Sequence, residues 1–255
     1  MHFEQLDKQM RIYEESLDQI ILPEIYMVAR LDGRGFTRLT KDLCHFDAPF
    51  DVHFRDLMVD TVKELMNCGF RVVYGYTESD EISLLFHPEE NTFNRKTRKY
   101  NSILAGEASA SFSHRLGQTG VFDSRIVPLP TVQRVKDYFL WRQEDAHRNA
   151  LNSWCYWILR DDGDSPGKAS KALERKSVAF KNELLFQHGI NFDKLPSWQK
   201  RGVGLWFENY QKAGFNPKTQ ENVVTTRRGI KVEYDLPLHE EYAKLVAGFV
   251  EGVWE

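Results

Sequence analysis

The sequence predicts an α+β protein in which a ferredoxin-like βαββαβ unit is followed by a C-terminal α/β extension. The first observation is the order of apolar patterns over residues 1–130, which alternate between strand and helix spacing. The second is a change of character after Pro130, where longer helical and hairpin patterns begin. The third is the position of two acidic turns, at Asp32 and at Asp80–Glu81, each at the end of a short apolar run. We therefore expect a compact unit with an N-terminal helix, and an extension over 131–255 packed onto it.

Within the first unit, helical and strand spacing alternate. The apolar stripe of residues 12–22 predicts an opening helix, which Pro23 ends because proline cannot continue a helix. Gly69 ends a later helix, as glycine commonly does. In order, the pattern predicts strands over 25–31, 70–76, 82–86 and 122–129, and helices over 50–68 and 93–116.

The extension after Pro130 has longer elements. A tryptophan-rich amphipathic pattern predicts a helix over 132–159, and the Asp, Gly and Pro residues of 161–167 predict a loop. Alternating segments at 202–210 and 222–234 predict a β-hairpin with a long polar connection. The remaining predicted elements are helices over 168–188, in two pieces, and over 239–253.

The predicted topology brings the two acidic turns together. In a βαββαβ sheet the first and third strands are antiparallel neighbours at the centre. The end of the first strand, with Asp32, then lies beside the start of the third, with Asp80 and Glu81. Two-metal nucleotidyl transfer needs carboxylates around ions roughly 3.5–4 Å apart, and Asp32-Gly33-Arg34-Gly35 leaves backbone N–H groups free for phosphate oxygens. The sequence therefore predicts a seat for Mg²⁺ and a nucleoside triphosphate.

Each motif also has an ordinary structural interpretation. Asp-Gly pairs usually form β-turns, and acidic residues are common in hairpin turns such as Ser79–Glu81. The charge run Arg95–Lys99 is typical of a solvated helix face, although Lys96 and Lys99 share one face and suit phosphate binding. The convergence at one sheet end, more than any single motif, favours a functional site.

The composition limits the partners and the cell compartment that we expect for this protein. The chain has 255 residues, 42% of them hydrophobic, and a formal net charge of −3, so bulk charge indicates no nucleic-acid partner. The three cysteines are widely spaced and form no C-x-x-C motif, which argues against a disulfide framework and a zinc site. No apolar run approaches the ~20 residues of a membrane span, and the first residues do not resemble a signal peptide. We therefore expect a cytoplasmic protein with no membrane partner.

Six segments spread over most of the chain resemble the tRNA-His guanylyltransferase family, which extends RNA in the reverse, 3′-to-5′, direction. The resemblance implies a polymerase-type palm as the catalytic domain of residues 1–130, and an extension over 131–255 that binds the RNA 5′ end and makes oligomer contacts. It also implies a homo-oligomer, a dimer or a tetramer, with tRNA and nucleoside triphosphates as partners. The matching segments are Ala29–Phe36, Ser79–Glu81, Phe93–Tyr100, Phe122–Arg125, Tyr138–Asn149 and Lys181–Phe186.

The resemblance implies a role for each matching position. Asp32, Asp80 and Glu81 would be the catalytic residues, with two Mg²⁺ ions held by Asp32, Asp80 and the Gly33 carbonyl. The implied nucleotide-binding residues are Asp32, Gly33, Arg34, Gly35, Phe36, Thr37, Ser79, Asp80 and Lys99. The implied RNA or 5′-phosphate contacts are Arg30, Lys96, His147, Asn149, Lys181 and Asn182. Arg227 and Arg228 are further candidates for RNA contact, with a solvated hairpin as an equal alternative.

The implied chemistry starts with ATP, which adenylylates a 5′-monophosphorylated RNA. The 3′-hydroxyl of an incoming nucleoside triphosphate, usually GTP, then attacks the activated phosphate and expels AMP. Two departures favour the bacterial and archaeal branch, which resembles template-dependent repair polymerases, over the enzyme that adds one G to tRNA-His. The chain reads His147-Arg148-Asn149-Ala150 where the eukaryotic enzymes carry His-Ile-Asn-Asn, and Phe46-Asp47-Ala48-Pro49 where they usually carry a loop lysine.

Two other functions compete with this hypothesis. A palm-type nucleotidyl cyclase has a similar acidic hairpin, but such hairpins commonly carry a Gly-Gly that is absent here. A non-catalytic RNA-binding module on an RRM-like sheet would place aromatic side chains on the exposed face of the central strands. The acidic cluster at one sheet end favours the nucleotidyltransferase over both.

Overall fold

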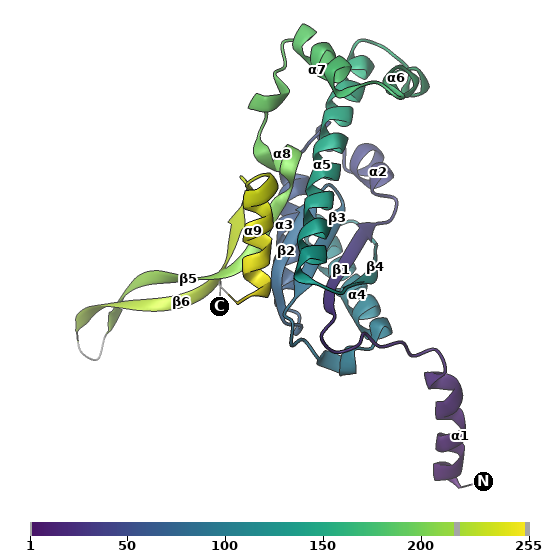
Figure 1. Ribbon diagram of the computed structural model, residues 1–255. Coiled ribbons are helices and arrows are strands. Elements are labelled where there is room, and N and C mark those ends of the chain that lie inside the picture. Colours follow the sequence, from purple (N-terminus) through teal and green to yellow (C-terminus); the bar gives the residue numbers. More distant parts are fainter. Residues whose placement is uncertain (1, 217–219, 253–255) are drawn as a thin grey trace.

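The computed structural model describes residues 2–216 and 220–252. Its centre is a six-stranded antiparallel sheet in the order β4-β1-β3-β2-β5-β6 (Figure 1). The first four strands have the ferredoxin-like order, as predicted, and the hairpin of the extension adds to their β2 edge. The strands are β1 (Tyr26–Gly33), β2 (Val72–Glu78), β3 (Glu81–Phe86), β4 (Phe122–Leu129), β5 (Val203–Asn216) and β6 (Glu221–Glu233).

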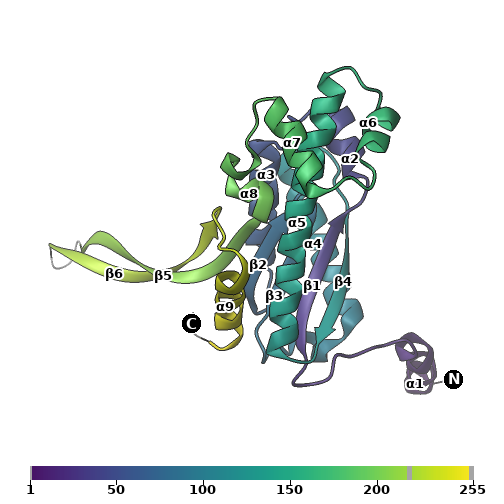
Figure 2. The same ribbon diagram turned by 45° about the horizontal axis from the view of Figure 1, so that its top comes forward.

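Helices cover both faces of the sheet (Figures 1 and 2). On one face, α3 (Val52–Leu65) and α4 (Thr97–Leu116) enclose a core that includes Leu31, Ile82 and Leu84. On the other face, α5 (Val132–Asp161) and α9 (His239–Val250) pack on Val28, Tyr74 and Leu85. The alternation of side chains along each strand therefore serves two cores, because successive residues point to opposite faces.

Smaller elements complete the chain. A helix α1 (Phe3–Glu15) precedes the sheet, and α2 (Phe36–Arg38) with the turn Leu39–Leu43 follows β1. Beyond α5 lie α6 (Pro166–Leu173), α7 (Val178–Gln187) and α8 (Ser197–Arg201). None of the described helices is long and apolar enough to cross a membrane.

Four predicted boundaries differ from those in the structure. The opening helix ends at Glu15, and Ile20 instead forms a β-bridge with Lys96. The helix predicted from residue 93 begins at Thr97, because residues 93–95 have positive φ angles that a helix does not allow. The hairpin strands extend to Asn216 and from Glu221, so the predicted polar connection is mostly strand, and its centre, 217–219, lies outside the described residues. The last predicted helix ends at Val250, before residue 253, which also lies outside them.

Candidate active site

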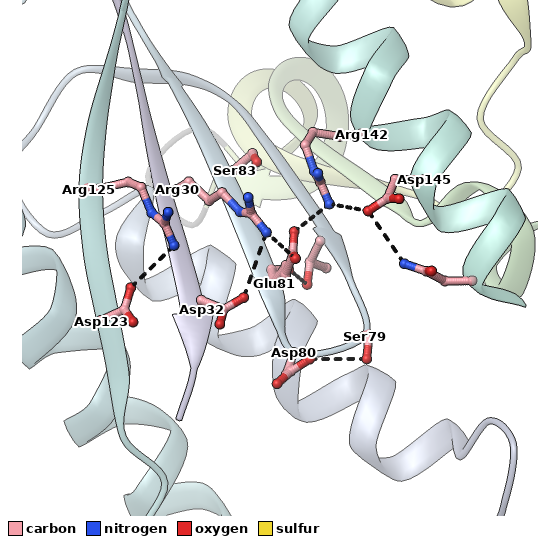
Figure 3. A network of polar contacts seen from close by, with 12 residues as sticks. Arg30, Asp32, Ser79, Asp80, Glu81, Ser83, Asp123, Arg125, Arg142 and Asp145 are labelled. Atoms are coloured by element: carbon pink, nitrogen blue, oxygen red, sulfur yellow. Dashed lines mark hydrogen bonds and ion pairs between the residues drawn. The ribbon is translucent and has the colours of Figure 1, made fainter. Parts of the chain in front are cut away.

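The register of the sheet places the acidic residues together, as the topology predicts (Figure 3). Asp32 at the end of β1 lies opposite Glu81 at the start of β3. The Gly33 backbone N–H donates a hydrogen bond of 3.1 Å to the Asp80 carbonyl, which ties the end of β1 to the β2–β3 turn. That turn has only two residues, and Ser79 takes a positive φ of 49° to close it.

Glu81 is held by two arginines rather than left free (Figure 3). Its Oε2 accepts a hydrogen bond of 2.7 Å from Arg142 Nη2, and its Oε1 is paired with Arg30. The Arg142 side chain is only 2% exposed, and its Nη2 also donates to Asp145 Oδ2 at 2.9 Å. Both carboxylate oxygens of Glu81 are therefore neutralised, so Glu81 supports the acidic centre through charge and position.

Within the described residues, no arginine or lysine donates a hydrogen bond to Asp32 or Asp80. Arg30 Nη2 lies 3.9 Å from Asp32 Oδ1, but the same nitrogen is hydrogen-bonded to Glu81. Asp80 accepts a hydrogen bond of 3.2 Å from the Ser79 hydroxyl. Burial, and then the negative charge of Asp32, raise the pKa of Asp80 to about 6. Two neighbouring carboxylates that repel each other are a favourable seat for a hard cation.

Mg²⁺ suits this pair of carboxylates. Within the described residues, no three or more His, Cys, Asp or Glu side chains are grouped to hold a metal. Mg²⁺ is usually bound by only one or two carboxylates, with substrate phosphates and water as the other ligands. Asp32 and Asp80, with the backbone carbonyl of Gly33 next to Asp32 in the chain, match that ligand set in number and chemistry.

Packing and backbone conformation explain the two glycines of the loop after β1, Gly33 and Gly35. A Cβ on Gly33 would lie 2.5 Å from the Phe36 ring, so no larger residue fits there without movement. Gly35 has a φ of 75°, in the left-handed region that favours glycine. The Phe36 ring is buried against Phe112 and Phe122, with ring centroids 5.1 and 4.9 Å away. Phe36, predicted to bind nucleotide, therefore anchors the loop in the core, and only its backbone remains for a ligand.

A cavity of about 400 Å³ opens beside Asp80. One wall comes from the first unit and includes Thr37, Thr40 and Ser79. The opposite wall comes from the extension and includes Asn149, Trp157, Trp198 and other residues of α5 and α8. The acidic centre and the cavity together form a site with room for a small polar ligand.

Comparisons with known proteins agree with this geometry. A family profile described as "tRNAHis guanylyltransferase" matches residues 7–130, and one described as "Thg1 C terminal domain" matches residues 133–238. The chain is 30% identical to a tRNA(His) guanylyltransferase of Debaryomyces hansenii over 85% of this chain and 87% of that protein. It is 33% identical to the enzyme of Neurospora crassa over 75% of this chain and 69% of that protein.

The chain belongs to the tRNA(His) guanylyltransferase family.

Solved structures share the fold. A bacterial tRNA(His) guanylyltransferase (Thg1)-like protein in complex with GTP has a TM-score of 0.75 at 24% identity, covering 96% of this chain and 98% of that one. The Saccharomyces cerevisiae tRNA(His) guanylyltransferase has a TM-score of 0.69 at 28% identity, covering 76% of this chain and 90% of that one. The cyclase and the binding module are not favoured. In addition, the aromatic side chains Tyr74 and Tyr76 of β2 are buried, so they offer no surface for stacking RNA bases.

Only some of the predicted site residues line the cavity. Asn149, Thr37 and Ser79 line it, whereas Arg30 is committed to Glu81. His147 packs against the Phe192 ring at 5.2 Å. Burial lowers the pKa of His147.

The remaining predicted contacts lie on three other parts of the chain. β3 runs away from the acidic turn, and Lys96 and Lys99 follow its far end, where Lys96 pairs with Asp18 at 2.7 Å. Lys99 therefore lies near the end of the sheet opposite Asp80, and its contact with the nucleotide stays a prediction. Lys181 and Asn182 lie on α7, and Arg227 and Arg228 lie on the protruding hairpin, where Arg228 stacks on Phe207.

Sequence reasoning missed two sets of residues in this family member. Arg142, which holds Glu81, and Asp145, which holds Arg142, belong to the polar run 141–149, from which only His147 and Asn149 were chosen. Their i,i+3 spacing with opposite charge was the available signal. Lys41 lines the cavity with its Nζ 4.9 Å from the Trp157 ring centroid, and nothing in its local sequence marks it.

Proposed function

We propose that this protein is a nucleotidyltransferase that adds nucleotides to the 5′ end of tRNA in the 3′-to-5′ direction. The observation that carries this proposal is the convergence of Asp32, at the end of β1, with Asp80, in the β2–β3 turn, where Asp80 lines an open cavity. Family membership supports the tRNA substrate and the direction of synthesis. The acidic centre supports nucleotidyl transfer rather than simple binding.

Different residues of the site would bind the metal ions, neutralise Glu81 and bind the triphosphate. Asp32, Asp80 and the Gly33 carbonyl would hold two Mg²⁺ ions, which when bound lower the pKa of the attacking hydroxyl and stabilise the leaving group. Arg30 and Arg142 neutralise Glu81, so that negative charge at the centre resides on Asp32 and Asp80. The helical turn that starts at Phe36 offers backbone N–H groups without acceptors inside the helix, which suit triphosphate oxygens.

The reaction proceeds in two transfers at this centre. A 5′-phosphate oxygen of the RNA attacks the α-phosphorus of ATP and pyrophosphate leaves. The 3′-hydroxyl oxygen of the incoming nucleoside triphosphate then attacks the activated 5′-phosphorus, and AMP leaves as the proton is lost from the hydroxyl. Lys41, which lines the cavity, supplies a cation near the transferred phosphates.

Template-dependent repair of 5′-truncated tRNA is the form of this activity that we propose. The two segments that depart from the eukaryotic pattern both reach the cavity, since Ala48 and Ala150 line it from opposite sides. The small side chain of Ala48 leaves room around a bound nucleotide, while Ala150 is buried at the other wall. This supports choice of the nucleotide by pairing with a template base.

The decisive experiment measures nucleotide addition to a 5′-monophosphorylated tRNA that lacks its first nucleotide, with ATP, Mg²⁺ and each labelled nucleoside triphosphate. We expect addition that follows the opposing template base. Asp80→Ala should lower the addition rate by at least about a thousandfold while tRNA binding is largely kept, because metal-held transition-state charge is lost. Asp137→Ala, which removes an exposed carboxylate on the first turns of α5, is the matched control and should retain activity.

Three results would contradict parts of this proposal. Addition of G alone, to full-length tRNA-His and regardless of template, would reject template-dependent repair but keep the nucleotidyltransferase. No addition to any RNA, with tight RNA binding, would reject catalysis. Full activity of Asp80→Ala would reject the acidic centre as its site.

A further inference from the structure

Glu78 is a carboxyl side chain in the cavity that none of the described residues binds. It is the last residue of β2, it is partly buried, and it lines the cavity beside Ser79 and Asp80. Its oxygens are open to the cavity, since no buried polar atom without a partner among the described residues belongs to Glu78. A carboxyl group that reaches a cavity without a protein partner is available to bind a ligand.

The other carboxylates of the cavity are engaged or exposed. Asp51 caps α3 and accepts a hydrogen bond of 2.9 Å from the Asp47 N–H. Glu81 is held by two arginines, and Asp80 is a proposed metal ligand. The Asp47 side chain is exposed on the loop before α3. Among the described residues, Glu78 is therefore the partly buried carboxyl of the cavity that is left for the organic part of a ligand.

The sheet places Glu78 in a row with Asp32. Glu78 lies opposite Glu81 on β3, and Glu81 lies opposite Asp32 on β1. Directly opposite residues of an antiparallel pair point to the same face. Neighbouring strands are about 4.8 Å apart, so the backbones at Glu78 and Asp32 are about 10 Å apart. No three acidic side chains of the described chain are grouped to share a metal, so Glu78 lies beside the proposed metal site rather than in it.

The chemistry of the reaction determines which part of a nucleotide meets Glu78. The attacking 3′-hydroxyl of the incoming nucleotide lies at the metal ions, and the phosphates are drawn to those ions and to Lys41. The 2′-hydroxyl is on the adjacent carbon of the ribose, and its O–H donates to a carboxyl oxygen. Acidic side chains hold ribose hydroxyls in this way in dinucleotide-binding folds. A deoxyribonucleotide lacks this donor.

We propose that Glu78 binds the ribose 2′-hydroxyl of the incoming nucleoside triphosphate and thereby selects ribonucleotides over deoxyribonucleotides. The same contact positions the neighbouring 3′-hydroxyl for attack on the activated 5′-phosphorus. Glu78 is thus a positioning and specificity residue that takes no part in making or breaking bonds. This inference rests on the proposed function, because it requires the attacking hydroxyl to lie at Asp32 and Asp80.

Addition of GTP and of dGTP to a 5′-triphosphorylated tRNA that lacks its first nucleotide, with C as the opposing template base, tests this role. Such an RNA carries its own leaving group, pyrophosphate, so the assay needs no ATP and contains no second ribonucleotide. The parent protein should prefer GTP by at least about fivefold in kcat/KM, which corresponds to one hydrogen bond. Glu78→Ala should lower kcat/KM for GTP to the value for dGTP, and should leave dGTP addition nearly unchanged.

Two further variants separate the hydrogen bond from general damage. Glu78→Gln keeps an oxygen that accepts a hydrogen bond, so it should retain part of the preference for GTP. Glu107→Ala removes an exposed carboxylate on α4 and should keep the full preference. A fall in GTP and dGTP addition by the same factor in Glu78→Ala, or an unchanged preference, would overturn the role of Glu78.

Equilibrium binding of GTP and dGTP with Mg²⁺, in the absence of RNA, gives a readout that needs no turnover. The parent protein should bind GTP at least about threefold more tightly than dGTP. Glu78→Ala should abolish this difference, and Glu107→Ala should keep it. If the parent protein adds no nucleotide to any RNA, the proposed function fails, and the binding ratio still decides whether Glu78 contacts the 2′-hydroxyl. Equal affinities of the parent protein for GTP and dGTP would overturn the contact.

Discussion

Glu81 shows how a single buried side chain organises the acidic centre. Its carboxylate lies between Arg30, on the neighbouring strand, and Arg142, which reaches down from α5. Asp145 holds Arg142 from the other side at 2.9 Å. This chain of alternating charges fixes Glu81 on the same face as Asp32, and it leaves Asp32 and Asp80 as the carboxylates that face a ligand.

Arg142 is therefore expected to matter for both stability and turnover. Arg142→Met leaves Glu81 and Asp145 without their shared buried partner, and should lower the free energy of unfolding by about 3–5 kcal/mol. Arg142→Lys keeps the charge and should recover part of that loss. Urea denaturation measures the free energy, and kcat and KM for nucleotide addition measure the effect on the site.

A double-mutant cycle separates the Arg142–Glu81 interaction from general damage. In a Glu81→Gln background, Arg142→Met should cost clearly less than it does alone, because the carboxylate that it leaves unpaired is already gone. An equal cost in both backgrounds would show that the two side chains act independently.

At the residue scale, the sequence predicted the carboxylates of the acidic centre but not the arginine that holds Glu81 in place. Asp32, Asp80 and Glu81 were found because each interrupts an apolar strand at a position that topology brings together. Arg142 was missed because an arginine in a polar helical run normally faces water, and only tertiary packing makes this one buried. His147 was chosen from the same run, although it packs against Phe192 instead.

Among the elements, the start of α4 depends on one buried carboxylate. Glu90 is fully buried, and it accepts hydrogen bonds from the Arg71 N–H at 2.6 Å, the Thr92 N–H at 2.7 Å and the Tyr100 hydroxyl at 2.9 Å. Burial alone would raise the pKa of Glu90, but these donors outweigh it and lower the pKa below its ordinary value. Glu90 thus joins the end of β3 to the first turn of α4.

Glu90→Gln should lower the free energy of unfolding by roughly 1–3 kcal/mol at pH 7. Because the folded pKa is lowered, the carboxylate stabilises the fold above its unfolded pKa of about 4.3, and this is lost as the pH falls through the folded pKa. The difference between the variant and the parent should therefore shrink toward pH 3. Glu89→Gln, at the adjacent exposed position, is the control, and denaturation curves at both pH values make the comparison. A pH-independent difference would contradict the role of the charge.

The same region explains why some element boundaries could not be predicted. Arg95 is buried and pairs with the Ile25 carbonyl while donating to the Glu90 carbonyl at 3.1 Å, contacts that hold residues 93–95 out of helical geometry. The Ile25 carbonyl lies 70 residues from Arg95 in the sequence, and its contact with Arg95 exists only in the folded chain. Local sequence therefore does not predict where α4 begins. By contrast, α3 and α5 were predicted well because their apolar spacing is itself the cause of their packing.

For the whole molecule, catalytic and folding requirements oppose each other at Asp80. A carboxyl whose folded pKa lies above its unfolded value of 3.8 costs stability at higher pH, because folding favours the protonated form. At pH 7.5 and without Mg²⁺, Asp80→Asn should therefore raise the free energy of unfolding by about 1 kcal/mol after solvent screening, or Tm by roughly 2–4 °C.

Mg²⁺ should reverse that order. Bound metal stabilises the folded parent protein by mass action, whereas Asp80→Asn lacks a ligand and should gain little. Thermal unfolding with and without Mg²⁺, beside Asp137→Asn as a control, tests both halves. A less stable metal-free Asp80→Asn, or one that Mg²⁺ stabilises as much as the parent, would contradict this account.

The order of the first four strands followed from the sequence, but the junction of the two units did not. Pairing of β2 with β5, from Tyr74 opposite Trp206 to Thr77 opposite Val203, links segments more than a hundred residues apart. Local patterns predicted each strand, and nothing local selected this edge.

The cavity beside Asp80 has one wall from each half of the chain, with Thr37 and Ser79 on one side and Asn152 and Trp198 on the other. The core beneath is also shared, because Tyr74 and Leu85 pack with Phe139 and Tyr242. Neither half of the chain therefore contains a complete binding site. A change of substrate specificity would require compatible changes in both halves, so we expect the extension and the acidic strands to have evolved together.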